Sequence, residues 1–405
     1  MIPLEEARAH VFAACPPLAP VVRAVRASLG LVTASPVTAA EDVPPFDNSA
    51  VDGFAVVAAD TADGQVELDV VATLAAGAAP QVGVSTGQTV RIMTGAPIPP
   101  GADAIVMVED SEPLDGGRRV RLTRKVSSGD AVRLAGSDVR VGDLVLSAGV
   151  ELRPAHLGVL ASIGRMEVEV VPAVRVGVLS TGDELVDDGS PLKPGQIRET
   201  NRTTLAAALA QAGCDIVDLG VVRDDEAGLE QVLHEAARRC DALVTSGGVS
   251  MGDFDIVKAV LSRLADMRWM QIAIRPAKPF AFGTLDGGDG RRVPVFGLPG
   301  NPVSSLVSFE LIARPALRQM MGHPQPDRTS VVAISDDGLP RRPDGKTHWS
   351  RVHGAFEADG RFHVRSIGAQ GSHQLAATAA ANALAEVVDG DGVAPGGNVA
   401  VLLLG

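Results

Sequence analysis

The sequence has few aromatic residues and little positive charge, and these shortages exclude some classes of protein. It contains no tyrosine and two tryptophans, and its formal net charge is −13. Proteins that bind nucleic acids need a basic surface, and many stack bases on aromatic rings. The composition therefore argues against a nucleic-acid partner, whereas small anions could still bind in local pockets.

Cysteine pairs and long apolar runs are also absent. Cys15, Cys214 and Cys240 form no CxxC or other metal-ligand spacing, so no zinc site is indicated and reduced thiols inside a cytosolic protein are expected. No run of about 18 uncharged apolar residues occurs. Residues 1–10 carry acids early and lack the apolar centre of a signal peptide. We therefore expect a cytoplasmic protein without a membrane span.

The 405 residues are sufficient for roughly two to four domains. Residues 1–43 and 141–172 combine helical and extended patterns and predict a linking domain. Residues 44–140 have short alternating runs between turn signals, which predicts an inserted β-rich domain. Residues 173–323 alternate strand and helix, which predicts a mainly parallel sheet covered by helices on both faces. Residues 324–405 predict a small β-barrel or sandwich, in which the Ala-rich segment 374–384 could be helical.

In a parallel α/β sheet, ligands bind beyond the carboxyl ends of the strands. Three segments directly follow predicted strands: residues 181–184, 245–255 and 298–301. We expect them to lie along one rim of the sheet.

The central rim segment reads TSGGVSMGDFD over residues 245–255. Gly247, Gly248 and Gly252 let the chain approach a bound group, and successive amides before a helix favour phosphate. Asp253 and Asp255 would lie beside that phosphate, an arrangement that suits an intervening divalent cation. The alternative is that Asp253 caps the helix and the glycines only form a tight turn.

Three polar residues outside the α/β segment also lie in turns. Asp52 ends an acidic loop that leads straight into a strand, Thr94 lies in a rigid loop rich in Gly and Pro, and Asp138 lies in a similar turn. Each of them is either an ordinary turn former or a residue of a binding wall.

One basic stretch, residues 274–279, stands out because the chain has only five lysines. Arg275 and Lys278 beside Gly-rich amides and carboxylates fit a phosphate ester or an oxyanion held with a metal, although Lys278 could simply be a solubilising side chain. The nucleophile-elbow, Walker and dinucleotide patterns are absent. The residues alone thus predict a metal-assisted phosphate or phosphoanhydride site on the α/β domain.

Five separated motifs add a resemblance to this interpretation. They are PPFDNSAVDGFA at 44–55, RIMTGAPIPPGAD at 91–103, STGDEL at 180–185, SGGVSMGDFD at 246–255 and GLPGNP at 297–302. In this order they resemble the motifs of the MoeA family, the molybdopterin molybdenumtransferases, which are similar to the E domain of gephyrin.

The resemblance implies an enzyme that binds adenylylated molybdopterin, hydrolyses its phosphoanhydride with release of AMP, and inserts molybdate to give molybdenum cofactor, with Mg²⁺ as the metal. It implies an elongated homodimer in which the α/β domain of one subunit meets the Asp52-bearing domain of the other. Molybdopterin adenylyltransferase and molybdoenzyme apoproteins would be further partners.

The resemblance also assigns roles by position. A tetrahedral dianion needs several fixed donors, and the basic and hydroxyl residues implied around molybdate supply them. The implied roles are catalytic for Asp52, Thr94, Asp138 and Glu184; binding of adenylylated molybdopterin and its phosphates for Ser246, Gly247, Gly248, Ser250, Gly252, Asp224, Pro299 and Pro302; molybdate binding for Arg275, Lys278, Arg351 and Ser372; and metal ligation for Asp253 and Asp255.

The chain departs from the family pattern at three positions. Ala277 replaces the glycine of the usual Lys-Pro-Gly-Lys-Pro, Ser137 stands where Glu is common, and His373 where Gly is common. A weakly active or tungstate-preferring paralogue, or a non-catalytic molybdopterin-binding scaffold, is therefore an alternative. A molybdopterin adenylyltransferase, which shares the SGG turn, is another, but residues 1–170 and the C-terminal β domain argue against it.

Overall fold

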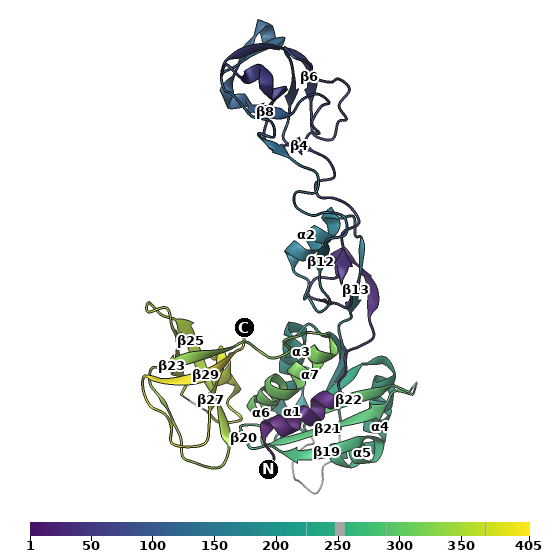
Figure 1. Ribbon diagram of the computed structural model, residues 1–405. Coiled ribbons are helices and arrows are strands. Elements are labelled where there is room, and N and C mark those ends of the chain that lie inside the picture. The colour runs from purple at the N-terminus through teal and green to yellow at the C-terminus, as the bar shows by residue number, and fades with distance from the viewer. Residues whose placement is uncertain (224, 248–255, 289, 369) are drawn as a thin grey trace.

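The computed structural model describes residues 1–223, 225–247, 256–288, 290–368 and 370–405. The chain is elongated, with a distal body (residues 44–140) at one end, a middle body (residues 19–43 and 141–172), and an α/β body (residues 173–323) beside a C-terminal barrel (residues 324–405) at the other end (Figure 1). No helix in the described ranges is long and apolar enough to cross a membrane.

The α/β body is built on a six-stranded sheet in the order β17-β14-β18-β22-β21-β19. The first four strands are parallel, whereas β21 and β19 run antiparallel at one edge. Fold and sheet agree with the mainly parallel α/β arrangement predicted from the sequence. The strands are β14 (Arg175–Thr181), β17 (Asp215–Val222), β18 (Ala242–Ser246), β22 (Arg292–Leu298), β21 (Pro279–Asp286) and β19 (Asp266–Gln271).

Neighbouring residues of a strand point to opposite faces of the sheet, and here both sets are apolar. Helices therefore cover both faces. Val178 packs with one group of helices and Leu179 with the other. The first group is α1 (Leu4–Ala13), α3 (Asn201–Gln211), α6 (Pro302–Ser308) and α7 (Arg314–Met320); the second is α4 (Glu226–Arg239) and α5 (Ile256–Leu264).

Helices α6 and α7 form one continuous run that contains a π-helical turn, η5 (Phe309–Ala313). Pro315 follows this turn and has no N–H to donate to the carbonyl of Leu311. The guanidinium of Arg8 donates to that carbonyl instead, at 2.5 Å. Helix α1 therefore supplies the hydrogen bond that the proline removes.

The C-terminal domain is a small barrel, which is one of the two predicted alternatives, a barrel or a sandwich. Its strands are β23 (Ser330–Ser335), β25 (Thr347–Phe356), β26 (Phe362–Ser366), β27 (Ala383–Val387) and β29 (Gly397–Leu403), and pairing of β25 with β27 closes the ring. The short β20 (Ile274–Arg275) of the α/β body pairs with β25, so that Arg275 lies opposite His348. The other short pair is β24 (Leu339–Pro340) and β28 (Gly392–Val393).

The expectation of a helix over residues 374–384 is wrong for most of that segment. Only α8 (Leu375–Thr378) is helical, and Ala383 begins strand β27. Ala383 and Ala385 are buried in the barrel core, where pairing with β25 and β29 outweighs the helix preference of alanine.

The distal body contains a six-stranded sheet in the order β8-β5-β7-β6-β10-β9. The strands are β5 (Gly53–Val56), β6 (Val66–Leu74), β7 (Gln88–Ile92), β8 (Ala104–Met107), β9 (Ser111–Leu114) and β10 (Arg119–Leu122). At its base β4 (Asn48–Ser49) pairs with β11 (Val132–Arg133).

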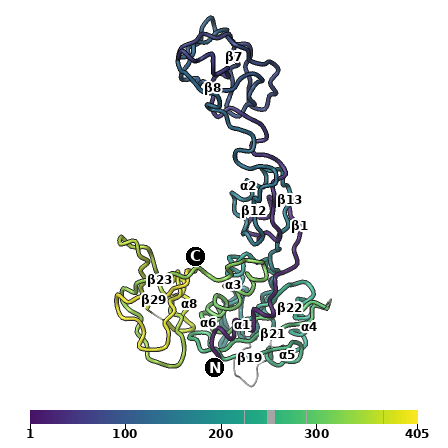
Figure 2. The backbone as a smooth tube through the Cα atoms, in the orientation of Figure 1, coloured from purple at the N-terminus to yellow at the C-terminus, as the bar shows by residue number. Residues whose placement is uncertain are grey.

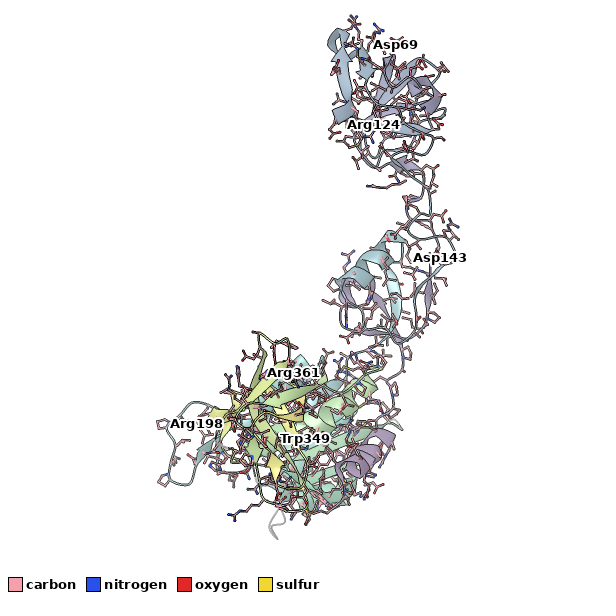
Figure 3. All side chains as sticks on the ribbon, turned by 60° about the vertical axis from the view of Figure 1, so that its left-hand side comes forward. Asp69, Arg124, Asp143, Arg198, Trp349 and Arg361 are labelled. Carbon is pink, nitrogen blue, oxygen red and sulfur yellow. The ribbon has the colours of Figure 1, made fainter. Side chains whose placement is uncertain are left out.

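The chain passes through the middle body twice, on its way to the distal body and on its return (Figure 2). The elements there are β1 (Val21–Ala24), β2 (Val32–Thr33), β3 (Val37–Thr38), β12 (Leu144–Leu146), α2 (Pro154–Ser162) and β13 (Glu167–Val171). Figure 3 marks the three levels: Asp69 and Arg124 lie on the distal body, Asp143 in the middle, and Trp349 and Arg361 at the other end. Arg198 lies on a projecting segment formed by β15 (Leu185–Val186) and β16 (Ile197–Arg198).

Candidate functional site

The rim predicted from the strand-end rule is present. Strand β18 lies between β14 and β22, so the segments that follow these strands are neighbours. The Gly247 N–H donates to the Leu298 carbonyl at 3.1 Å. The side-chain amide of Asn201 donates to Ser246 Oγ and to the Gly300 carbonyl, both at 2.7 Å. Asn201 thus joins two of the rim segments.

Gly247 adopts a backbone conformation that favours glycine, with φ of 94°. A Cβ atom at this position would lie 3.3 Å from the carbonyl and hydroxyl oxygens of Thr181. Glycine therefore keeps the start of the loop close to β14. The remaining predicted residues of this loop and the neighbouring turn, Gly248, Ser250, Gly252, Asp253, Asp255 and Asp224, lie outside the described residues.

The other predicted residues of the rim differ in exposure. Ser246 and Pro299 are buried, whereas the side chain of Glu184 is exposed beyond β14. The Glu184 carboxylate lies against Gly182, where a Cβ atom would collide with it. Pro302 is the first residue of α6, a position at which a missing N–H costs little. Glu184 is thus the polar side chain of this set that solvent or a ligand can reach.

Sequence reasoning missed Glu199 and Asn201, which stabilise the rim from the start of α3. The buried Glu199 carboxylate accepts hydrogen bonds from Ser180 Oγ at 2.9 Å and from the Arg202 N–H at 2.7 Å. The only signal for these residues in the sequence is their place at the start of a helical pattern.

In the distal body, Asp52 and Thr94 are brought together by neighbouring loops. Asp52 Oδ1 accepts hydrogen bonds from the backbone N–H and the hydroxyl of Thr94, both at 2.6 Å. These bonds, helped by nearby Arg91, hold the pKa of the Asp52 carboxyl below its ordinary value. Gly53 follows because a side chain there would strike the Val106 carbonyl of the next strand. Asp52 is therefore an exposed, ionised carboxylate in a fixed position.

Asp138 lies at the junction of the distal and middle bodies. Its backbone N–H donates to the Val43 carbonyl at 2.9 Å, and its side chain is exposed, as is that of Ser137. Two acids of the same region are turn residues instead: Asp103 Oδ1 accepts the Ala58 N–H, and Asp47 Oδ1 accepts the Ala135 N–H, both at 2.7 Å.

Within one chain, the four residues with implied catalytic roles do not form one site. Asp52, Thr94 and Asp138 belong to the distal body and its base, whereas Glu184 follows β14 in the α/β body. The middle body lies between the two groups (Figure 1). A site that uses both groups needs a second copy of the chain or a large rearrangement.

A basic pocket of about 550 Å³ lies where the α/β body meets the barrel. Of the residues with implied molybdate roles, Arg275 lines this pocket and is exposed, and Lys278 is exposed four residues after β20 begins. Sequence reasoning missed the other polar residues of the pocket, which include Arg342, Asp344, His348 and Gln370.

The side chain of Arg351, for which the resemblance implies molybdate binding, is fully buried. It donates to Thr378 Oγ1 at 2.7 Å and to the carbonyls of Gln374 and Gly371 at 3.2 and 3.3 Å. Burial lowers the pKa of the Arg351 guanidinium. Arg351 therefore fixes the turn that carries Ser372 in place of facing the pocket.

Ser372 itself lies at the contact between the barrel and α6. Its carbonyl accepts the Val303 N–H at 3.1 Å, in the first turn of α6, close to the end of the rim. Its neighbour His373 is exposed. The barrel thereby brings the Ser372 turn to the same side of the α/β body as the rim.

Ala277, which replaces the usual glycine of the family motif, keeps a left-handed conformation with φ of 78°. This conformation costs about 1–2 kcal/mol for alanine. The methyl group is buried in the main core of the α/β body, which offsets part of that cost. The loop between Arg275 and Lys278 therefore keeps the backbone conformation that glycine favours.

Comparisons with known proteins agree with this architecture along the chain. Three family models match: "MoeA N-terminal region (domain I and II)" over residues 2–164, "Probable molybdopterin binding domain" over 177–319 and "MoeA C-terminal region (domain IV)" over 339–404.

Relatives and solved structures match over most of their length. The chain is 39% identical to a molybdopterin molybdenumtransferase of Haemophilus influenzae, over 84% of this chain and 83% of that protein. It is 40% identical to molybdopterin molybdenumtransferase 2 of Mycobacterium tuberculosis, over 88% of each. A crystal structure of a molybdopterin biosynthesis MoeA protein from Pyrococcus horikosii superposes with a TM-score of 0.80 at 30% identity, over 100% of this chain and 99% of that one. The chain belongs to the MoeA family.

Proposed function

We propose that this protein is a molybdopterin molybdenumtransferase, an enzyme of molybdenum cofactor biosynthesis. The observation that carries the proposal is the match along most of the chain to relatives with this activity, at about 40% identity. The substrates are molybdopterin, in its adenylylated form, and molybdate. The products are AMP and molybdenum cofactor.

The rim of the α/β body is the proposed site for the phosphates of adenylylated molybdopterin. Gly247 begins the Gly-rich segment whose sequence favours phosphate binding, and Asn201 joins Ser246 to Gly300. The proposed contacts are Ser246, Gly247, Pro299 and Pro302, with Gly248, Ser250, Gly252 and Asp224 outside the described residues.

Asp52 is suited to orienting water or a cation near the phosphoanhydride. Thr94 occupies Oδ1 of its carboxylate, and Oδ2 points to no partner among the described residues. A carboxylate with a lowered pKa is a weak general base near neutral pH. Asp52 therefore positions the attacking water, which breaks the P–O–P bond and gives AMP and the molybdopterin phosphate.

Magnesium is the proposed metal, with Asp253 and Asp255 as its ligands. When bound, it would neutralise charge on the phosphoanhydride oxygens. Over the described ranges no group of three His, Cys, Asp or Glu residues could hold a metal ion. The described residues therefore do not form the magnesium site without Asp253 and Asp255. Of the described acids, Glu184 is exposed on the rim and could complete the ligand set.

Molybdate is placed at the contact between the α/β body and the barrel. Arg275 and Lys278 are exposed cations on one side of this contact, and Ser372 lies on the other. Arg351 supports the Ser372 turn from inside the barrel. The anion would lie next to the rim, within reach of the dithiolene of a molybdopterin whose phosphates occupy the rim.

The proposed enzyme is a homodimer with its active site between subunits. Asp52 and Glu184 lie in bodies that are separated within one chain, and in the proposed dimer the partner would supply one of them (Figure 1). The middle body exposes apolar side chains that a second copy would cover. They are Val22, Leu29, Val141, Leu144 and Met166.

The proposed protein is cytoplasmic and has partners before and after it in the same biosynthesis. Three free, buried cysteines fit a reducing compartment such as the cytoplasm. Molybdopterin adenylyltransferase would supply the substrate, and molybdoenzyme apoproteins would receive the product. A preference for tungstate, weak activity or a non-catalytic scaffold role are the competing outcomes.

The decisive assay measures AMP release from adenylylated molybdopterin with and without molybdate. We expect molybdate-dependent release from the unaltered protein and its loss in Asp52→Asn. Asp69→Asn is the matched control, because Asp69 is an exposed acid on the sheet of the same distal body (Figure 3). Release only with tungstate would identify a tungstate enzyme, and no release with either anion would indicate a scaffold.

A further inference from the structure

The carboxylate of Asp344, which lines the basic pocket, is surrounded by three cationic side chains and the imidazole of His348. Arg341 Nη2 is 2.7 Å from Oδ1, while His348 Nε2 and Lys346 Nζ are 3.1 and 3.3 Å from Oδ2. Arg275 Nη1, which comes from the α/β body, is 3.8 Å from the same Oδ2. One carboxylate oxygen thus faces three donors from two parts of the fold.

The pocket keeps an excess of positive charge after this pairing. Arg342 also lines it, and in the described part of the chain the Arg342 guanidinium makes no ion pair or hydrogen bond. The other nearby acid, Asp389, is already paired with Arg341 at 2.6 Å. In a protein with a net charge of −13, this local excess makes the pocket a favourable place for a small anion.

The partners of Asp344 are not equally fixed. Arg341 is buried, and its Nη1 donates to the carbonyls of Lys346, Val387 and Val388. Arg275 is two-thirds exposed, and its distance of 3.8 Å to Oδ2 is too long for a hydrogen bond. Arg341 therefore anchors Oδ1, whereas the donors around Oδ2 could turn to another anion.

Ionisation of Asp344 is maintained by this cluster. Partial desolvation opposes the charge, but hydrogen bonds from His348 and Lys346 outweigh it and hold the pKa of the carboxyl below its ordinary value. At neutral pH the pocket thus contains an internal anion, whose Oδ2 faces Arg275, Lys346 and His348.

We propose that Asp344 is an internal competitor for the oxyanion: a tetrahedral dianion enters the pocket by displacing the Asp344 carboxylate from Arg275 and His348, and Arg342 becomes an additional donor to it. This inference rests on the proposed function, in which the dianion is molybdate. The competing carboxylate weakens binding of the free anion, and Arg342 and His348 determine its affinity together with Arg275.

Calorimetric titration with molybdate alone tests the inference without turnover. Asp344→Asn keeps the size of the side chain and removes its charge, so we expect molybdate to bind about tenfold more tightly, the effect of about one pKa unit of charge interaction. Asp336→Asn is the matched control, because Asp336 pairs with His363 and Arg365 in the same barrel but does not line the pocket. Asp336→Asn should bind molybdate with the affinity of the unaltered protein.

Arg342→Gln provides a second, independent variant. The side chain is exposed and makes no hydrogen bond or ion pair with the described residues, so we expect an unchanged melting temperature and roughly tenfold weaker molybdate binding. Unchanged affinity in Asp344→Asn would overturn the competitor role of Asp344, and unchanged affinity in Arg342→Gln would overturn the role of Arg342 as a donor. If Asp344→Asn fails to fold, unchanged affinity in Arg342→Gln still overturns the inference, because the proposed oxyanion site then lacks its additional donor.

The two proposals fail in different ways. If the unaltered protein releases AMP with molybdate but Asp344→Asn binds molybdate no more tightly, the competitor role is wrong and the enzyme assignment stands. If Asp344→Asn binds the dianion more tightly but no AMP is released by the unaltered protein, the pocket is an oxyanion site and the enzyme assignment falls.

Discussion

Asp52 shows how two hydrogen bonds lower the pKa of a single side chain. Both come from Thr94, so Thr94→Ala should raise the pKa of Asp52 towards its ordinary value. Thr94→Ser keeps the hydroxyl and the backbone donor and should retain most of the lowering. Carboxyl NMR titration of the Asp52 signal measures both values. An unchanged pKa in Thr94→Ala would show that Thr94 does not hold this carboxylate.

His323 makes the stability of the protein sensitive to acid. Burial lowers its pKa to about 4, and the nearby Arg318 acts in the same direction, while Glu151 at 3.3 Å opposes them without prevailing. The pKa of His323 is lower in the folded state than the ordinary 6.5, so between pH 6.5 and pH 4 the unfolded state binds a proton more readily than the folded state. The free energy of unfolding is therefore highest above pH 6.5 and falls as the pH drops from 6.5 to 4.

Replacing His323 with Gln should remove this sensitivity. The unaltered protein should lose on the order of 2 kcal/mol more stability than His323→Gln between pH 7 and pH 4.5. Urea unfolding at the two pH values measures the difference. His234→Gln is the control, because His234 is exposed on α4. Equal losses in the unaltered protein and His323→Gln would contradict the assignment.

At the scale of elements, the turn after β18 tests whether the rim binds the phosphates. Gly247 and Gly213 have similar φ angles, 94° and 90°, but a Cβ atom meets Thr181 at Gly247 and open space at Gly213. Each change to alanine should cost about 1–2 kcal/mol of stability. Only Gly247→Ala should also weaken binding of adenylylated molybdopterin, by about tenfold or more. Equal binding by both variants would place the phosphates elsewhere.

Element types were predictable from the sequence wherever one local pattern dominated. Alternating strands and helices over residues 173–323 predicted the α/β sheet and its rim, since the strand-end rule needs only the order of elements. The segment 374–384 was predicted wrongly because its alanines pack in a barrel formed by distant strands. The π turn before Pro315 depends on Arg8, about 300 residues away in sequence.

The site was less predictable than the fold, because its contacts are mostly non-local. Motif resemblance proposed Asp52 and Thr94 separately, but their hydrogen bonds join residues 42 apart. Arg351 is buried by the turn at residues 371–378, and the approach of Arg275 to Asp344 depends on how the barrel docks on β20. These relations leave no periodicity or spacing in the sequence.

At the scale of the whole molecule, the elongated shape explains why a subunit should be incomplete alone. The distal body holds Asp52 and the α/β body holds Glu184, with the middle body between them. In the proposed symmetric dimer each distal body would reach the rim of the partner, which would give two equivalent sites. The exposed apolar residues of the middle body suit the contact between the copies.

Subunit mixing tests this intersubunit site most directly. Asp52→Asn and Glu184→Gln should each be inactive as homodimers. A dimer that contains one of each variant has one site with both changes and one site with neither. Random pairing should therefore restore about a quarter of the unaltered activity, because half of the dimers are mixed and each has one intact site of two. No recovery in verified mixed dimers would show that Asp52 and Glu184 act within the same subunit, or that one of them acts outside the site.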